Sequence, residues 1–150
     1  MNTPRAVDVG WGAIVRDADG EVAVAGRGRI DHVMDSFQAE LISCLQGAQA
    51  AADIGASRVV LETDAMMVKN AVNSNNYNLA AGGSLIAELK YVLSTNFVEW
   101  DFEHVPRECN KVAHALAAWG HKCSEVEDPI VESLPNCIRV MVADDCSAIE

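Results

Sequence analysis

Four residues towards the end of the chain are of the types that bind zinc. They are Cys109, His114, His121 and Cys123. Their spacing, C-x4-H-x6-H-x-C, does not match that of a known zinc site, and the phase of a helix would not bring all four together. We therefore expect packing and surface roles for these residues as a set.

Two carboxylates, Glu40 and Asp64, stand beside segments that the apolar pattern buries. Glu40 lies one position before Leu41 and three after Phe37, so it is either a solvated helix charge or a boundary residue facing the edge of a sheet. Asp64 follows the apolar, β-branched run at 58–62, where an aspartate most often caps the next helix. The local pattern leaves the role of both side chains open.

The elements that position these residues begin with a hairpin. Two β-rich runs, at 11–16 and 21–25, flank the turn sequence Asp-Ala-Asp-Gly at 17–20, and we expect a third short strand at 27–32. A helix follows, with apolar residues at three- and four-residue steps, Asp35 or Ser36 as its cap and Gly55 as its stop. The later predicted elements are a buried strand at 58–62, helices at 65–72 and 84–93, a half-exposed strand at 98–103 and a helix at 109–122.

The C-terminal segment at 124–150 is acidic and begins as a linker around Pro129. Its end, SLPNCIRVMVADD, fits either a short helix after Pro135 or a strand at 137–142, and we favour the helix. We assign 1–123 to one domain and expect the tail at 124–150 to pack on or near it.

The whole-chain composition describes a single folded domain with an acidic surface. The chain has 150 residues, 50% of them hydrophobic, and a formal net charge of -11. It is long enough to bury its own core, but it lacks the basic footprint of a tight, nonspecific nucleic-acid binder. Nucleic-acid contact would have to be local or bridged by divalent cations. A weak basic stripe of Arg27, Arg29, Lys69 and Lys111 is one candidate, although such residues more often serve solubility.

The cysteines and the N-terminus point to an intracellular protein. The five cysteines are odd in number and scattered, which favours reduced thiols over a disulfide framework. The N-terminus has no signal-peptide pattern, and no apolar run approaches the ~20 residues that span a bilayer. We expect a location in the cytoplasm or nucleus, with no secretion and no membrane association.

Three blocks of sequence, together with the order of the elements, resemble the type 1 ribonuclease H family, and most closely its plant reverse-transcriptase-like branch. The blocks are GWGAIVRDADGEV, QAELISCLQGAQAAADIGASRVVLETDA and HVPRECNKVAHALA. The resemblance covers about residues 10–145. It implies an α/β fold, a ribonuclease H-like mixed sheet in the order β-β-β-α-β-α-α-β-α with helices on both faces.

The resemblance also implies a chemistry and a set of site residues. The family hydrolyses the RNA strand of RNA–DNA hybrids with two Mg²⁺ ions held by four carboxylates, an arrangement that stabilises both the attacking and the leaving oxygen. Glu40 and Asp64 match two of these acids. His114 stands at the position of the fourth, and imidazole is a poor ligand for Mg²⁺. The resemblance therefore implies a catalytic set of Glu40, Asp64 and His114, with Arg107, Asn110 and His104 as weaker candidates for contacts with nucleic acid.

The first acid of the family, at the end of its first strand, has no clear counterpart. Asp8 stands two residues before Gly10 with only MNTPRAV before it, and a hairpin loop needs at least two residues. We therefore expect the first strand to be missing or replaced, and Asp8 is a doubtful third metal ligand. In the family this strand lies centrally, so its loss would leave unpaired backbone edges on both neighbours. The replacements that stay open are a rearranged N-terminus, the tail, or a partner chain, including a strand-exchanged homodimer.

Two functional hypotheses follow. The first is a ribonuclease H-like pseudoenzyme related to retroelements, catalytically impaired, that acts as a binding or interaction module for nucleic acid or a protein partner. The alternative is an active Mg²⁺-dependent endonuclease that cleaves the RNA strand of RNA–DNA hybrids. It would need a third oxygen ligand from Asp8, Asp144 or Asp145.

Overall fold

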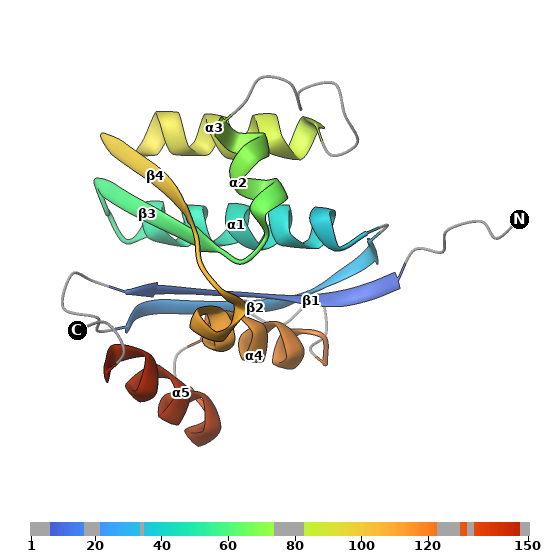
Figure 1. Cartoon of the computed structure of the whole chain (residues 1–150), viewed down its shortest axis with the longest axis vertical. Helices are drawn as coiled ribbons and strands as arrows, with labels where there is room; N and C mark the ends of the chain where they lie inside the picture. The colour runs from blue at the N-terminus through green and yellow to red at the C-terminus, as the bar shows by residue number, and fades with distance from the viewer. Residues whose placement is uncertain are drawn as a thin grey trace, which may run out of the picture.

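The computed structural model of the chain describes residues 7–16, 22–33, 35–73, 83–122, 130–131 and 134–147 (Figure 1). Within these residues the elements follow the order β-β-α-β-α-α-β-α-β-α, with the 3-10 helix before the fourth α-helix, and helices lie on both sides of the strands. None of the helices in this part of the chain is long and apolar enough to cross a membrane.

The predicted hairpin is present. Strand β1 (Val7–Arg16) pairs with β2 (Val22–Val33) in an antiparallel ladder that reaches from Val7↔Val33 to Arg16↔Val22. The turn sequence at 17–20 lies outside the described residues. The prediction of two separate strands at 21–25 and 27–32 is wrong, because β1 is long enough to pair with both runs and they form one continuous strand.

A short strand, β5 (Ile130–Val131), pairs with the other edge of β2, so the first sheet has the order β1-β2-β5. The sequence pattern at 124–131, which indicates a linker, does not predict this strand. The second sheet consists of β3 (Arg58–Thr63) and β4 (Glu99–His104), which run parallel in register from Arg58↔Glu99 to Thr63↔His104. Among the described strands, no hydrogen-bonded ladder joins β1 to β3. What takes the place of the family's first strand stays a prediction.

The helices are α1 (Ser36–Asp53), α2 (Met66–Asn73), α3 (Gly83–Asn96), α4 (Lys111–Gly120) and α5 (Asn136–Ser147), and the short 3-10 helix η2 (Arg107–Asn110) leads into α4. The helix predicted after Pro135 is therefore confirmed as α5, and the alternative strand at 137–142 is wrong. The helix α5 packs beside α4, and its Ile138 is buried in the same small core as Val112 and Leu116.

Helices α1 and α4 cover opposite faces of β1. A Cβ added at Gly12 would lie 2.4 Å from the Ala113 carbonyl oxygen of α4, whereas a Cβ added at Gly47 of α1 would lie 3.3 Å from the Cβ of Ala13. Neighbouring residues of a strand point to opposite faces. Gly12 therefore faces α4 and Ala13 faces α1, with both helices in close contact with the strand.

The larger hydrophobic core lies between α1, α3 and the second sheet. Leu41, Ile86, Leu89, Leu93 and Phe102 are among its fully buried side chains. Phe37, Leu45 and Ala52 of the predicted α1 face pack against it in part. The half-exposed strand predicted at 98–103 is present as β4, but it begins one residue later than predicted. Val98, which precedes its first residue, is 83% exposed.

Both predicted ends of α1 are confirmed. The side chain of Asp35 accepts a hydrogen bond from the backbone N–H of Gln38 at 2.8 Å. At the other end Gly55 has φ +84, and two hydrogen bonds close the helix, from Gly55 N–H to the Ala52 carbonyl and from Ala56 N–H to the Ala51 carbonyl. This pattern is a Schellman motif, which requires a left-handed residue at the position of Gly55.

The substitution Gly55→Ala tests this helix end. We expect it to lower the free energy of unfolding by about 1 kcal/mol, because a left-handed backbone is costly for a residue with a Cβ. No atom lies within 4 Å of the added Cβ, so the loss comes from the backbone alone. Urea unfolding measures it, with Ser57→Ala as the control at a nearby exposed position. A Gly55→Ala chain as stable as the parent would contradict the left-handed conformation.

Candidate functional site

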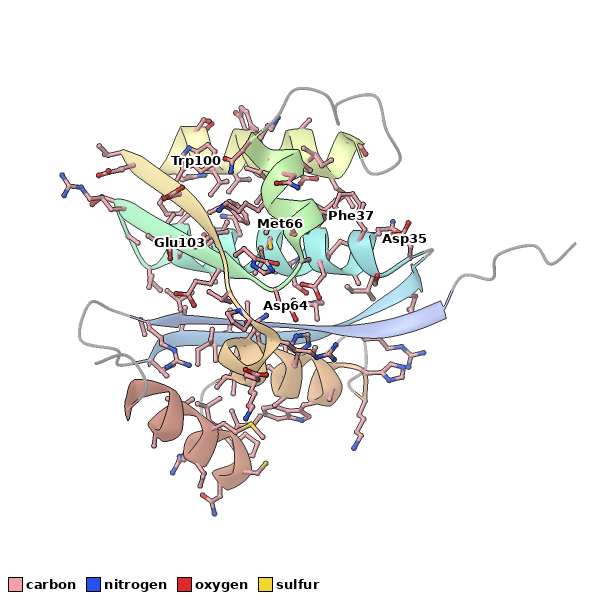
Figure 2. The ribbon with its side chains drawn as sticks, viewed as in Figure 1. Asp35, Phe37, Asp64, Met66, Trp100 and Glu103 are labelled. Atoms are coloured by element: carbon pink, nitrogen blue, oxygen red, sulfur yellow. The ribbon has the colours of Figure 1, made fainter. Side chains whose placement is uncertain are left out.

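The residues predicted to form the site come from three elements that meet at one end of β3. Asp64 follows β3 directly, Glu40 lies in the first half of α1, and His114 lies in the first half of α4. Figure 2 shows Asp64 at the point where the chain leaves β3 and faces α4. The fold thus brings together three residues that are far apart in the sequence.

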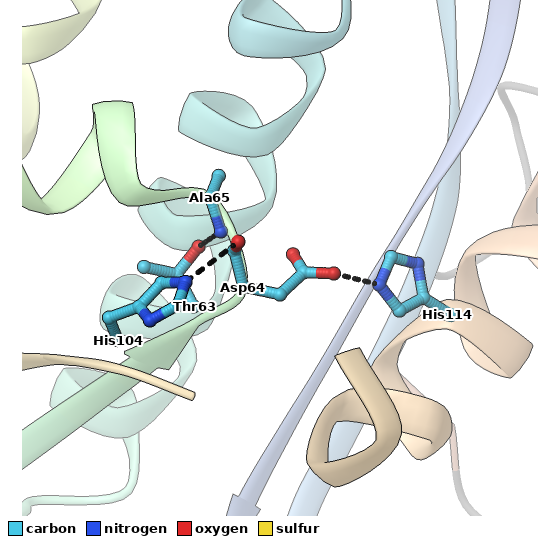
Figure 3. A network of polar contacts seen from close by, with 5 residues as sticks. All are labelled: Thr63, Asp64, Ala65, His104 and His114. Atoms are coloured by element: carbon cyan, nitrogen blue, oxygen red, sulfur yellow. Dashed lines mark hydrogen bonds and ion pairs between the residues drawn. The ribbon is translucent and has the colours of Figure 1, made fainter. Parts of the chain in front are cut away.

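The contact between Asp64 and His114 is the central interaction of the site. The Nε2 atom of His114 lies 2.9 Å from Oδ2 of Asp64 (Figure 3). The side chain of Asp64 is 14% exposed and that of His114 is 30% exposed, so the pair is partly shielded from solvent. Because an ionised carboxylate only accepts hydrogen bonds, His114 donates through a proton on Nε2.

The backbone on either side of Asp64 is also held. The Nε2 atom of His104 lies 3.2 Å from the Asp64 carbonyl oxygen, which can only accept, so His104 donates. The hydroxyl of Thr63, which is 1% exposed, accepts a hydrogen bond from the Ala65 N–H at 3.1 Å. These contacts fix the direction of the Asp64 side chain (Figure 3). The side chain of Asp64 contacts His114. We do not observe it in its other predicted role, as the cap of the next helix.

Glu40 lies within electrostatic range of the same group. Burial raises the pKa of its carboxyl above the usual value, and the Asp64 carboxylate raises it further. His114 and Arg107 act in the opposite direction and lower this pKa. The site therefore combines two partly buried acids with two basic side chains that offset their repulsion.

Not every predicted site residue has the expected environment. Asn110 begins α4, lines the same cavity as Glu40 and His114, and makes no side-chain capping bond. Arg107 is exposed beside Glu40, and His104 contacts the backbone of Asp64. The side chains of Asp8, Asp144 and Asp145 lie outside the described part of the chain, so their proposed roles as metal ligands stay predictions.

Sequence reasoning missed two contributors. Thr63 had no distinguishing signal, since a threonine at the end of a strand is ordinary. Cys44 did have one, because it stands one helical turn after Glu40 and so faces the same side of α1. Burial, followed by the charges of Glu40 and Asp64, raises the pKa of the Cys44 thiol to about 12. This thiol therefore stays protonated at neutral pH.

The donor set among the described side chains does not fit a pair of Mg²⁺ ions. No group of three or more His, Cys, Asp or Glu residues in that part of the chain is arranged to hold a metal. Glu40 and Asp64 offer oxygen atoms, and His114 donates to one of the two oxygens of Asp64. Mg²⁺ requires several oxygen ligands in near-octahedral geometry.

Two residues of the predicted basic stripe are engaged elsewhere. The guanidinium carbon of Arg27 lies 4.7 Å from the ring centre of Trp119, a cation–π contact. Arg29 forms an ion pair with Asp31 at 2.8 Å. Since both contacts occupy the guanidinium groups, these residues are poorer candidates for phosphate binding than the exposed Arg107 and Lys111 beside the site.

A large cavity adjoins the site. Its volume is about 880 Å³, and it extends between β1 and β3, with residues of α1 and α4 completing its walls. Glu40, Thr63, Asn110 and His114 line it together with apolar residues of both strands. The polar group around Asp64 therefore lies next to a space whose walls combine polar and apolar residues of two strands and two helices.

Comparison with known proteins agrees with this architecture. Residues 4–120 match the family described as Reverse transcriptase-like. The chain is 30% identical over 118 residues to Ribonuclease HI of Halobacterium salinarum, a match that covers 76% of this chain and 56% of that protein. The chain thus spans about half the length of this curated relative.

Two solved structures are similar. The crystal structure of RNase H1 from the same halophilic archaeon has a TM-score of 0.62 and 27% identity, covering 80% of this chain and 89% of that one. The N-terminal RNase H domain of a Mycobacterium tuberculosis protein, solved as a fusion with maltose binding protein, has a TM-score of 0.70 and 21% identity, covering 81% and 86%. At that identity the second likeness supports the fold alone.

The raised pKa of Glu40 predicts how its removal changes stability with pH. Because this pKa is higher in the folded chain than in the unfolded chain, the folded state binds more protons above pH 4.5, and stability falls as the pH rises through that window. We expect Glu40→Gln to be more stable than the parent at a pH of about 7, with the advantage lost at about 4. Denaturant unfolding in the presence of a chelator measures this.

The matched control is Glu88→Gln, which removes the same charge from an exposed position on α3. It should leave the pH dependence of the parent unchanged. A Glu40→Gln chain that is less stable than the parent at neutral pH would show that the carboxylate is favourable where it lies, contrary to the burial and repulsion described above.

Proposed function

Because this chain belongs to the Reverse transcriptase-like family and has the ribonuclease H fold, we propose that it is a nucleic-acid-binding module whose nuclease activity is impaired. The observation that carries this proposal is the hydrogen bond of 2.9 Å between His114 and Asp64. It joins a basic group to the carboxylate that the resemblance assigns to metal binding.

The impairment follows from the number and type of available ligands. A two-metal site depends on several anionic oxygens that hold the ions in a fixed relation to the scissile phosphate. Here one of the two gathered acids already has a hydrogen-bonding partner, and the imidazole of His114 stands where the resemblance places the family's fourth acid. A loss of ~3 kcal/mol in transition-state stabilisation would slow the step more than a hundredfold.

The proposed nucleic-acid contact centres on the start of α4. Arg107 and Lys111 are exposed there, and Asn110 is half-buried between them. Positively charged groups beside the first turn of a helix suit a phosphate, because the positive end of the helix dipole adds to the attraction. With a net charge of -11, the chain should bind an RNA–DNA hybrid weakly and through few phosphates.

The alternative is an active Mg²⁺-dependent endonuclease that cleaves the RNA strand of RNA–DNA hybrids. The mutual influence of Glu40 and Asp64 favours it, since the two acids are close enough for one to raise the pKa of the other. In this case the carboxylate of Asp8 would complete the site, and Mg²⁺ would displace His114 from Asp64. An intracellular location and an origin in a plant retroelement stay predictions.

The decisive activity test is incubation with a labelled RNA–DNA hybrid and Mg²⁺ or Mn²⁺. We expect cleavage at least a hundredfold slower than that of an active ribonuclease HI under the same conditions, because too few oxygen ligands hold the ions. His114→Asp supplies another carboxylate and should raise the Mg²⁺-induced increase in melting temperature. Efficient cleavage by the parent that Asp64→Asn abolishes would establish the alternative.

Nucleic-acid binding is tested separately with a catalytically silent hybrid in a buffer containing a chelator. Arg107→Gln should weaken binding and reduce the slope of log affinity against log salt by about 1, as expected for one lost phosphate contact. Arg58→Gln is the control, since it removes the same charge from an exposed position at the opposite end of β3. Equal effects of both substitutions would point to overall charge and contradict a contact at α4.

A further inference from the structure

One face of the sheet formed by β3 and β4 is open. Successive side chains of a strand point to opposite faces, as Trp100 and Glu103 of β4 do in Figure 2. On one face Val59, Leu61 and Phe102 pack into the larger hydrophobic core. The side chains of the opposite face are all exposed, and they are Arg58, Val60, Glu62, Glu99, Asp101 and Glu103. No described element therefore covers this side of the sheet, which we call the open face.

An open face is unusual for parallel strands. Strands β3 and β4 run parallel, and parallel strands in α/β proteins are normally covered by helices on both faces. Here Val60, in the middle of β3, is 55% exposed on the uncovered side. A strand that filled the space between β1 and β3 would lie in the plane of the sheet and pair with the edge of β3. It would leave the open face uncovered.

The open face is strongly acidic. It carries four carboxylates and only one basic group, the guanidinium of Arg58, which lies 3.5 Å from a carboxylate oxygen of Glu99. Glu62 and Glu103 stand directly opposite each other in the ladder. Like charges in this position destabilise a sheet. The folded chain therefore contains a repulsion that a positively charged partner would relieve.

We infer that the open face binds a positively charged helix of a partner protein, independently of the nucleic-acid contact proposed at α4. Along β4 the acids at alternate residues, Glu99, Asp101 and Glu103, recur about every 6.6 Å. Residues four apart in a helix recur about every 6 Å. A helix lying along β4 thus places basic residues at i, i+4 and i+8 against the three acids, and an apolar residue beside them meets Val60.

The charge of the chain argues against a second copy as the partner. The sequence has 22 acidic residues and 11 basic residues, a formal net charge of -11. Two such chains repel each other, whereas a basic segment is attracted over the whole approach and most strongly at the open face. The proposed partner is therefore a protein with a basic amphipathic helix.

The test uses the full chain and a fluorescent peptide, Ala-Ala-Gln-Lys-Ala-Ala-Leu-Lys-Gln-Ala-Leu-Lys-Ala-Gln, acetylated and amidated at its ends. We expect saturable binding by fluorescence anisotropy, with NMR shift changes at the amides of Val60, Asp101 and Glu103. A control peptide of the same composition has its lysines on different sides of the helix. It should bind about tenfold more weakly, because its lysines cannot reach the row of acids together.

Substitutions in the open face provide the complementary arm. The double variant Glu62→Gln with Glu103→Gln should weaken peptide binding about tenfold. It should also raise the melting temperature of the free chain, since it removes the repulsion across the ladder. The matched control is Asp53→Asn with Glu88→Gln, which removes two exposed charges from α1 and α3 and should bind the peptide within about twofold of the parent.

Val60→Thr separates the apolar contact from the charges. It keeps the β-branched shape and every charge of the open face, and it should weaken peptide binding about threefold because a hydroxyl is buried under the helix. Since Val60 is exposed in the free chain, the variant should fold as the parent does. Circular dichroism checks this.

Three outcomes would overturn the inference. The first is the absence of saturable binding. The second is equal weakening by the two double variants, or equal binding of the two peptides, either of which would show that overall charge alone attracts the peptide. The third is a set of NMR shift changes that omits β3 and β4. The assay contains no nucleic acid, so none of these outcomes depends on the proposed binding of a hybrid.

Discussion

The close packing of α4 against β1 is the constraint on which the site depends. Gly10 and Gly12 have no Cβ, so the carbonyl groups of Ala117 and Ala113 come directly against the strand. A methyl group at either glycine would meet backbone atoms, which cannot rotate away as a side chain can. This approach places the first half of α4 beside the end of β3, and only then does His114 come within hydrogen-bonding distance of Asp64.

The electrostatics of the site follow from that placement. Two acids that share a partly buried region repel each other, and burial adds to the cost by removing water from both. In a metal-binding site the ions would offset this repulsion. Here His114 and Arg107 do so in part, since both lower the pKa of Glu40 while Asp64 raises it. A histidine in place of an acid thus gives the two carboxylates a partner supplied by the chain itself.

Residue types within a short stretch of sequence predicted both ends of α1 and the presence of α5. The cap at Asp35, the left-handed end at Gly55 and the helix after Pro135 all follow from residue types within a few positions. The length of β2 depends on how far β1 extends beside it, which no local window contains. The pairing of Asp64 with His114, 50 residues apart, was likewise not predicted, although the resemblance had selected both residues.

The cavity and the polar site share walls, because Glu40 and His114 line the cavity. Any group that filled this space would remove water from Glu40 and raise the free energy of its charged form. By thermodynamic linkage, anything that neutralises Glu40 would in turn favour filling of the cavity. The two acids that repel each other in the empty site would therefore attract a positively charged group at this end of β3.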